Sequence, residues 1–205
     1  MSPSAALKQS KGEETRSQIL AAAVQQASAS GFESLTIGSL AEKTGMSKSG
    51  LFAHFGSKLD LQLATLDEAA RLFTQSVFLP AMKAPRGLKR LGALFENWLT
   101  WTERASLPGG CPVDAATREY IHQPGAMREA ALERQKLLDR EITKAVQMAI
   151  DSGELDRKAD AAQLADEMAG IVLSSYRTAL IVGVDEAGRR ARAAFQRLIQ
   201  SHSPR

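Results

Sequence analysis

The chain has 205 residues, of which 44% are hydrophobic and 24% are charged, and its formal net charge is +3. These values are typical of a globular protein that buries a sizeable core. The single cysteine, Cys111, excludes an intramolecular disulfide, and the N-terminal residues lack the apolar run of a secretory signal, so we expect a cytoplasmic protein. The small positive charge permits nucleic-acid binding but does not by itself indicate it.

Helical periodicity runs through nearly the whole chain, and no convincing strand pattern or repeat interrupts it. We predict a first helix over residues 13–30, closed by Gly31 and carrying an apolar stripe that includes Ile19 and Val24. Further helices are predicted over residues 57–79, 86–105, 124–153, 160–184 and 185–200. The fold class is therefore all-α. The most apolar stretch, residues 169–184, contains Arg177 and is too short to span a membrane.

The stretch "TIGSLAEKTGMSKSGLFAHFGSK", residues 36–58, predicts two short helices joined by a tight turn. Thr36 can cap the first helix, Gly45 can supply the positive φ of the turn, and Ser47 can cap a second helix that begins at Lys48. The small residues in the first turn of that second helix would let it approach a DNA backbone closely. The spacing therefore indicates a helix-turn-helix, although a plain helical hairpin would show a similar pattern.

This stretch, together with the preceding "RSQILAAAVQQASASGFESL", resembles the DNA-binding domain of the TetR family of bacterial transcriptional regulators. The resemblance covers about residues 13–66. It implies a three-helix DNA-binding module joined by a long fourth helix to a C-terminal helical bundle that binds a small molecule and forms a homodimer. The apolar surplus of residues 164–182 and the matching stripe of residues 191–198 place the dimer contact in the last two helices. On this basis we expect a flexible arm over residues 1–12, a DNA-binding domain over 13–57, a ligand-binding and dimerisation domain over 58–201 and a tail over 202–205.

The resemblance assigns DNA contacts to residues of the two short helices and the turn that follows them. These are Thr36, Ser47, Lys48, Ser49, Phe52, His54 and Lys58. The family usually has tyrosine where this chain has Phe52, so a phenolic hydroxyl that could donate to a phosphate is missing. Lys8, Lys11 and Arg16 are then expected to add to the attraction for DNA.

The resemblance also implies that aromatic residues of the C-terminal part surround a ligand cavity. The candidate ligand-binding residues are Phe73, Phe95, Trp98, Trp101, Cys111, Tyr120 and Tyr176. Each of them could equally belong to the core. An anionic ligand group could be bound by Arg104, Arg118, His122 or Arg177, or these side chains could simply face solvent.

Cys111 lies in the glycine-rich turn "PGGCPV" and allows two further readings. A thiol with a lowered pKa could sense oxidants or electrophiles, whereas most lone cysteines are buried small hydrophobic residues. Catalysis by Cys111 with His122 lacks a third, orienting group.

From the helix-turn-helix and the resemblance together, we expect a ligand-responsive DNA-binding repressor that is not an enzyme, has no metal site and needs no cofactor. The alternative is an all-helical small-molecule-binding or thiol-dependent protein whose helix-turn-helix is incidental.

Overall fold

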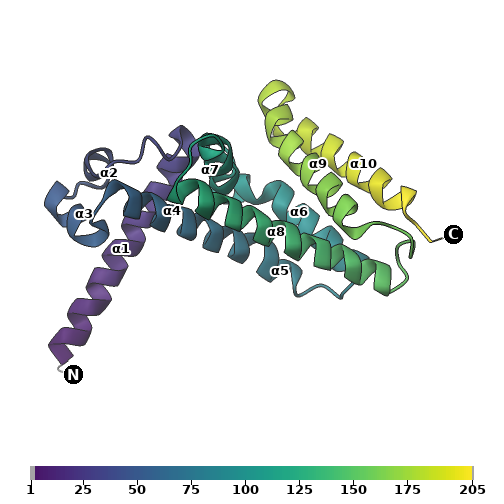
Figure 1. The fold of residues 1–205 in the computed structure, drawn as a ribbon, viewed down its shortest axis with the longest axis horizontal. Coiled ribbons are helices and arrows are strands. Elements are labelled where there is room, and N and C mark those ends of the chain that lie inside the picture. Colours follow the sequence, from purple (N-terminus) through teal and green to yellow (C-terminus); the bar gives the residue numbers. More distant parts are fainter. Residues whose placement is uncertain (1–2, 205) are drawn as a thin grey trace. The chain divides into compact units, whose positions relative to one another are not determined.

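The computed structural model describes residues 3–204, and among these every long regular element is a helix (Figure 1). The chain forms two compact units. The first unit comprises Met1–Arg71 and Ser106–Arg134, and the second comprises Leu72–Ala105 and Gln135–Arg205. The side chains of residues 1–11 lie outside the described part, and with them the expected contributions of Lys8 and Lys11.

The first unit is built from the N-terminal helices and one later helix. These are α1 (Pro3–Ser30), α2 (Ile37–Thr44), α3 (Lys48–Phe55), α4 (Lys58–Phe73) and α7 (Pro112–Tyr120). The predicted stripe on α1 is buried, as are Leu40 of α2 and Leu51 of α3. The helices α2 and α3 have eight residues each, and helices this short are stabilised mainly by packing. The buried apolar side chains therefore hold α2 and α3 in the unit.

The caps of α2 and α3 confirm the turn predicted from the sequence. The hydroxyl of Thr36 accepts a hydrogen bond from the amide of Ser39, and the hydroxyl of Ser47 accepts one from the amide of Gly50. Gly45 has a φ of 69°, in the left-handed region. Since this region strongly favours glycine, Gly45 fixes the angle at which the chain leaves α2.

Two helices of the first unit differ from the prediction. α1 begins at Pro3 and not near Glu13, so it extends into the segment expected to be a flexible arm; the run from Ala5 to Lys8 consists of good helix formers. The helix α7 was not predicted, because Pro112 looked like the end of a break. Proline is well tolerated at the first position of a helix, which is where Pro112 stands.

The second unit contains the remaining helical segments. These are a π-helix (Thr74–Phe78), α5 (Leu79–Ala81), α6 (Leu88–Arg104), most of α8 (Ala126–Asp151), α9 (Ala161–Val182) and α10 (Val184–Ser201). Figure 1 shows α9 and α10 side by side as an antiparallel pair. Among the residues that the structure describes, none of the helices combines the length and the apolar character that a membrane crossing requires.

The predicted helix over residues 57–79 is not α-helical throughout. It changes to a π-helix at Thr74, and Pro80 lies within α5 instead of following the helix. A π-turn leaves backbone carbonyls that side chains must satisfy. Two side chains of α6 do this: Asn97 donates to the carbonyl of Val77 at 3.1 Å and Arg104 donates to that of Ser76 at 3.1 Å. Sequence periodicity does not show such tertiary partners.

Candidate nucleic-acid interface

The helix α3 has one buried face and one exposed face. Leu51 and Phe55, four residues apart, are buried, and the guanidinium of Arg16 on α1 lies 5.0 Å from the centre of the Phe55 ring. Beside these buried residues, Lys48 and Ser49 are exposed, and Phe52 keeps 57% of its surface in solvent. The Phe52 ring is therefore accessible to a partner that approaches this side of α3.

The N-cap residues of α2 and α3, Thr36 and Ser47, are both exposed. They lie at the N-terminal ends of these helices, where backbone amides lack partners within the helix. The hydroxyls of Ser47 and Ser49 lie 3.2 Å apart, next to the first turn of α3. The cap hydroxyl of Thr36 also lies at the first turn of its helix, 3.0 Å from the amide of Ser39. Helix N-termini of this kind are suited to phosphate, because their amide groups and the helix dipole favour an anion.

Lys48 and His54 lie in the first and the last turn of α3. The ammonium group of Lys48 reaches over α2, close to the position that a Cβ on Gly38 would take, at 3.9 Å. His54 is half-buried in the last turn of α3, with its ring 6.3 Å from that of Phe55. The structure therefore brings Thr36, Ser47, Lys48, Ser49 and Phe52 into one region formed by two neighbouring helices.

Lys58 differs from the other predicted DNA contacts because it already has an anionic partner. Its ammonium group donates to Oε2 of Glu33 at 2.8 Å. The other carboxylate oxygen, Oε1, accepts from the hydroxyl of Tyr120 at 2.7 Å. These two hydrogen bonds, first that of Lys58 and then that of Tyr120, lower the pKa of Glu33. Glu33 is therefore ionised at neutral pH and pairs with Lys58.

Three residues of this network were not predicted as functional: Glu33, Gln62 and Glu119. The buried amide of Gln62 donates to the carbonyl of Phe32 at 2.8 Å and to the hydroxyl of Tyr120 at 3.2 Å. The carboxylate of Glu119 accepts from the amide of Glu33 at 2.7 Å. Because Glu119 is 86 residues from Glu33 in the chain, no local spacing pattern could have revealed the pair.

Three of the predicted ligand-binding residues form an aromatic cluster in the second unit. The ring of Phe73 meets the rings of Trp98 and Trp101 edge to face, at centroid distances of 5.9 and 5.2 Å. All three residues are buried. The indole Nε1 of Trp101 is buried and has no hydrogen-bond partner among the described residues. A buried donor left unpaired is costly, so an acceptor is expected there.

The other predicted ligand-binding residues are distributed around the fold. Phe95 stacks on Phe195 of α10 with the rings 4.0 Å apart, and the hydroxyl of Tyr176 donates to the carbonyl of Trp98 at 3.2 Å. Cys111 and Tyr120 belong to the first unit, whereas the aromatic cluster belongs to the second. The structure therefore does not gather all seven residues in one unit.

The environment of Cys111 opposes thiol chemistry. The residue is buried, and burial raises the pKa of its thiol to about 12. A reactive thiol needs a lowered pKa and access to solvent. The geometry therefore favours the reading of Cys111 as a small hydrophobic residue. The described residues also include no group of three or more histidine, cysteine, aspartate or glutamate side chains that could hold a metal ion.

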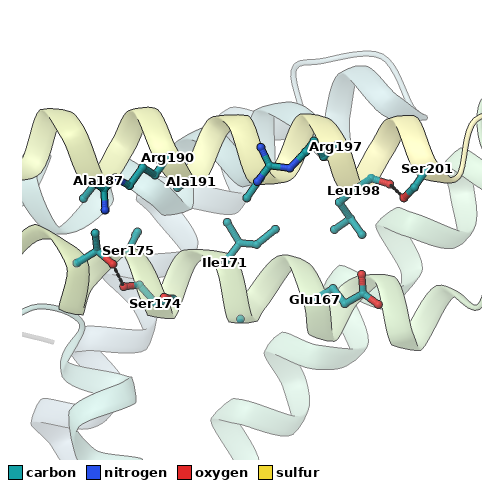
Figure 2. A pocket seen from close by; sticks show the side chains of 13 residues that line it. Glu167, Ile171, Ser174, Ser175, Ala187, Arg190, Ala191, Arg197, Leu198 and Ser201 are labelled. Atoms are coloured by element: carbon teal, nitrogen blue, oxygen red, sulfur yellow. Dashed lines mark hydrogen bonds between the residues drawn. The ribbon is translucent and has the colours of Figure 1, made fainter.

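A groove of about 870 Å³ runs between α9 and α10 in the second unit (Figure 2). Figure 2 shows Ile171 of α9 and Leu198 of α10 pointing into the space between the two helices. Small residues of α10, Ala187, Ala191 and Ala194, line the same groove, and Arg190 and Arg197 stand along it. At the tip of the helix pair, Leu180 and Ile181 are 88% and 73% exposed. This much exposed apolar surface indicates an interface.

The sequence matches two protein-family models. The model described as "Bacterial regulatory proteins, tetR family" matches residues 19–65, and the one described as "Tetracyclin repressor-like, C-terminal domain" matches residues 87–195. The first match contains α2 and α3, with the exposed surface described above. The second contains α6 to α9, the aromatic cluster's tryptophans and the greater part of α10. No curated protein sequence matches the chain.

Solved structures show the same fold over nearly the whole chain. A TetR transcriptional regulator from Chloroflexus aurantiacus J-10-FL is 26% identical, with a TM-score of 0.80, covering 93% of this chain and 94% of the other. AibR in complex with isovaleryl coenzyme A and operator DNA is 23% identical, with a TM-score of 0.64 and coverage of 79% and 85%. The ketosteroid regulator KstR2 of Mycobacterium tuberculosis is 16% identical, with a TM-score of 0.66 and coverage of 92% and 95%.

Proposed function

Because the chain belongs to the TetR family of bacterial regulatory proteins, we propose that it is a cytoplasmic transcriptional repressor that binds a palindromic operator as a homodimer. As a member of this family it is a DNA-binding transcriptional regulator and not an enzyme. In the proposed mechanism a small-molecule effector releases the dimer from DNA. No cofactor is required for this cycle.

The observation that carries the DNA-binding proposal is the division of α3 into a buried and an exposed face. Leu51 and Phe55 hold the helix in the first unit, and Lys48, Ser49 and Phe52 are left exposed on a rigid element. Side chains at the start of a recognition helix are those that reach base edges in the major groove. We assign base contact to Lys48 and backbone contact to Thr36, Ser47, Ser49, Phe52, His54 and Lys58.

The groove between α9 and α10 supports the proposed homodimer. The lining combines small and apolar side chains with Glu167, Arg190 and Arg197, and the same two helices of a second copy would cover it, which gives a four-helix bundle with two-fold symmetry. A symmetric dimer carries two copies of α3. To fit successive major grooves these must lie about 34 to 36 Å apart, so the dimer geometry sets the spacing of the operator half-sites.

The aromatic cluster supports the proposed effector site. Phe73, Trp98 and Trp101 would supply apolar contact area, and the unpaired indole donor of Trp101 would orient a ligand that offers a hydrogen-bond acceptor. The structural relative AibR is seen with both an effector molecule and operator DNA, so this fold can hold both kinds of partner.

Coupling between effector and DNA would pass along α4. This helix begins at Lys58, three residues after α3 ends, and continues without a break into the π-helix that Asn97 and Arg104 hold. An effector that displaces α6 would therefore also displace the C-terminal end of α4. This would change the separation of the two α3 helices of the proposed dimer. A coupling free energy of roughly 1 to 3 kcal/mol would weaken DNA binding about 5- to 150-fold.

Binding to DNA selected from a random library tests the proposed function. We expect the enriched sequences to be palindromic, and the affinity for them to fall steeply with salt, because phosphate contacts release counterions. The alternative, a small-molecule-binding protein with an incidental helix-turn-helix, predicts no enrichment at all. That result would refute the proposal.

A further inference from the structure

Lys58, the predicted phosphate contact, is held by an acidic side chain that is itself held by α7. The carboxylate of Glu33 accepts from Lys58 through Oε2 and from Tyr120 through Oε1. Both oxygens are therefore in use. Because the two hydrogen bonds lie on opposite oxygens, Tyr120 fixes the direction in which the other oxygen faces Lys58.

The last turn of α7 also fixes the backbone from which Glu33 projects. The carboxylate of Glu119 accepts from the amides of Phe32 and Glu33 at 2.8 and 2.7 Å. A Cβ on Gly31 would lie 3.0 Å from the same carboxylate, so the chain and Glu119 are in close contact. Neighbouring residues of α7, Glu119 and Tyr120, thus hold the main chain and the side chain of Glu33.

The place of α7 in the chain gives this contact a regulatory meaning. Its residues lie within the segment 87–195 that matches the C-terminal domain of the family. In the structure, however, they pack in the same compact unit as α2 and α3. The segment that matches the C-terminal domain therefore supplies the residues that hold Glu33, the partner of Lys58.

We propose that Glu33 occupies the position of a DNA phosphate at Lys58, and that Tyr120 sets how firmly it does so. Tyr120 and Glu33 are then positioning residues for DNA binding. This inference rests on the proposed function, since it requires that Lys58 contacts a phosphate. A carboxylate and a phosphate bound to one ammonium group repel each other, so the carboxylate of Glu33 opposes the binding of a phosphate at Lys58.

The ion pair between Lys58 and Glu33 is weak, so it adjusts the DNA affinity and does not abolish binding. The side chains of Lys58 and Glu33 are 43% and 54% exposed, so water and salt screen their attraction. Exposed ion pairs of this kind change an equilibrium by only about 2- to 5-fold. Loosening the hold of Tyr120 on Glu33, by a movement of α7, would change DNA affinity within that range.

Glu33→Gln is the central variant, because it removes the competing charge and keeps an oxygen that can accept from Tyr120. We expect it to bind a labelled random-sequence DNA duplex about 2- to 5-fold more tightly than the wild type. The matched control is Glu42→Gln, on the exposed side of α2, which measures the general effect of losing one negative charge. The gain at Glu33 should exceed the gain at Glu42.

A double-variant test shows whether the effect passes through Lys58. In a Lys58→Ala background, Glu33→Gln should bring no more gain than Glu42→Gln. Tyr120→Phe should tighten binding less than Glu33→Gln does, and its effect should vanish once Glu33 is replaced. Ser203→Ala, which removes an exposed hydroxyl that donates to the carbonyl of Ile199, provides the control for loss of a hydroxyl and should leave DNA binding unchanged.

Thermal unfolding of the same variants separates this role from a structural one. If Glu33 competes with phosphate, Glu33→Gln should lower the Tm and yet tighten DNA binding. If Glu33 has a purely structural role, the variant should lower both the Tm and the DNA affinity. Weaker binding by Glu33→Gln, a gain no larger than that of Glu42→Gln, or a gain that persists without Lys58 would overturn the inference. If the wild type and all variants fail to bind the duplex, the proposed DNA-binding function fails as well.

Discussion

The backbone of Gly109 lies directly against the backbone carbonyl of Ser28. A Cβ on Gly109 would stand 1.7 Å from that oxygen, a distance at which no side chain fits. Two hydrogen bonds hold the contact: the amide of Gly109 donates to the Ser28 hydroxyl at 3.1 Å, and that hydroxyl donates to the carbonyl of Gly110 at 2.9 Å. The loop before α7 is thereby attached to the C-terminal end of α1.

The first prediction follows from this close approach. Gly109→Ala should destabilise the protein by about 1–3 kcal/mol, because the added methyl group forces the two backbones apart. Denaturant unfolding measures the change. The control is Gly92→Ala in α6, where a Cβ would meet no atom within 4 Å, and alanine should raise stability by about 0.5–1 kcal/mol through its higher helix propensity. Equal effects at the two positions would show that the contact with Ser28 does not matter.

The DNA-binding turn could be predicted because its signals are local. Thr36, Gly45 and Ser47 each act on residues within a few positions, and the structure confirms the cap or turn assigned to each of them. The apolar stripe of α1 is buried for the same reason, since helical period alone determines which side chains share a face.

The features that were not predicted depend on tertiary partners. The π-helix at Thr74 is held by donors from α6, and the hydroxyl of Tyr120, a candidate effector contact, donates to Glu33. A weak signal for α7 was present: Pro112 suits the first helical position, and Asp114 and Arg118 form an ion pair four residues apart. Helical period can place Tyr120 on a face but does not identify what that face meets.

The second prediction separates the two lysines of the DNA-facing surface. Lys48→Ala should cost about 1 to 3 kcal/mol on the selected operator and blur its sequence preference, because Lys48 is assigned to a base edge. Lys58→Ala should weaken binding to all sequences alike and lower the salt slope by about one. Titrations on operator and random duplexes at several salt concentrations measure both effects. Equal, sequence-independent losses for the two variants would contradict the assignment.

The third prediction concerns pH and Cys111. Burial raises the pKa of the thiol from about 9 to about 12. Between these two values the unfolded chain loses a proton that the folded chain retains, so the unfolded state binds fewer protons and stability falls as pH rises. This loss should be smaller in Cys111→Ala, and the difference between the two proteins in unfolding experiments from pH 8 to pH 11 isolates the contribution of the thiol.

The same burial predicts slow thiol modification in the folded protein. A thiol reagent at pH 8 should label Cys111 at a rate that follows unfolding, and denaturant should accelerate the labelling strongly. Fast labelling of the native protein would instead restore the reading of Cys111 as a sensor.

The fourth prediction tests the homodimer with two matched substitutions. Ala194 lines the groove between α9 and α10, whereas Ala162 is exposed near the start of α9 and does not line it. Ala194→Glu should place a charge in the proposed interface and shift the protein to monomers, while Ala162→Glu should leave it dimeric. Sedimentation at several protein concentrations measures the shift. A wild type that is monomeric at micromolar concentration would rule out the proposed interface.

The last prediction concerns the buried indole of Trp101, whose Nε1 lacks a partner among the described residues. In Trp101→Phe the free protein loses an unsatisfied donor along with part of a ring, so we expect its stability to change little. A compound that releases the wild type from the selected operator should bind this variant about 2- to 10-fold more weakly, because the acceptor of the compound no longer receives a hydrogen bond from the indole. Thr143→Val removes a second buried side-chain atom that lacks a partner among the described residues, and it should leave release unchanged. Reciprocity adds a second measurement: operator DNA should weaken binding of the compound to the wild type by the factor by which the compound weakens operator binding. If Trp101→Phe and Thr143→Val respond to the compound alike, the acceptor of the effector does not lie at Trp101.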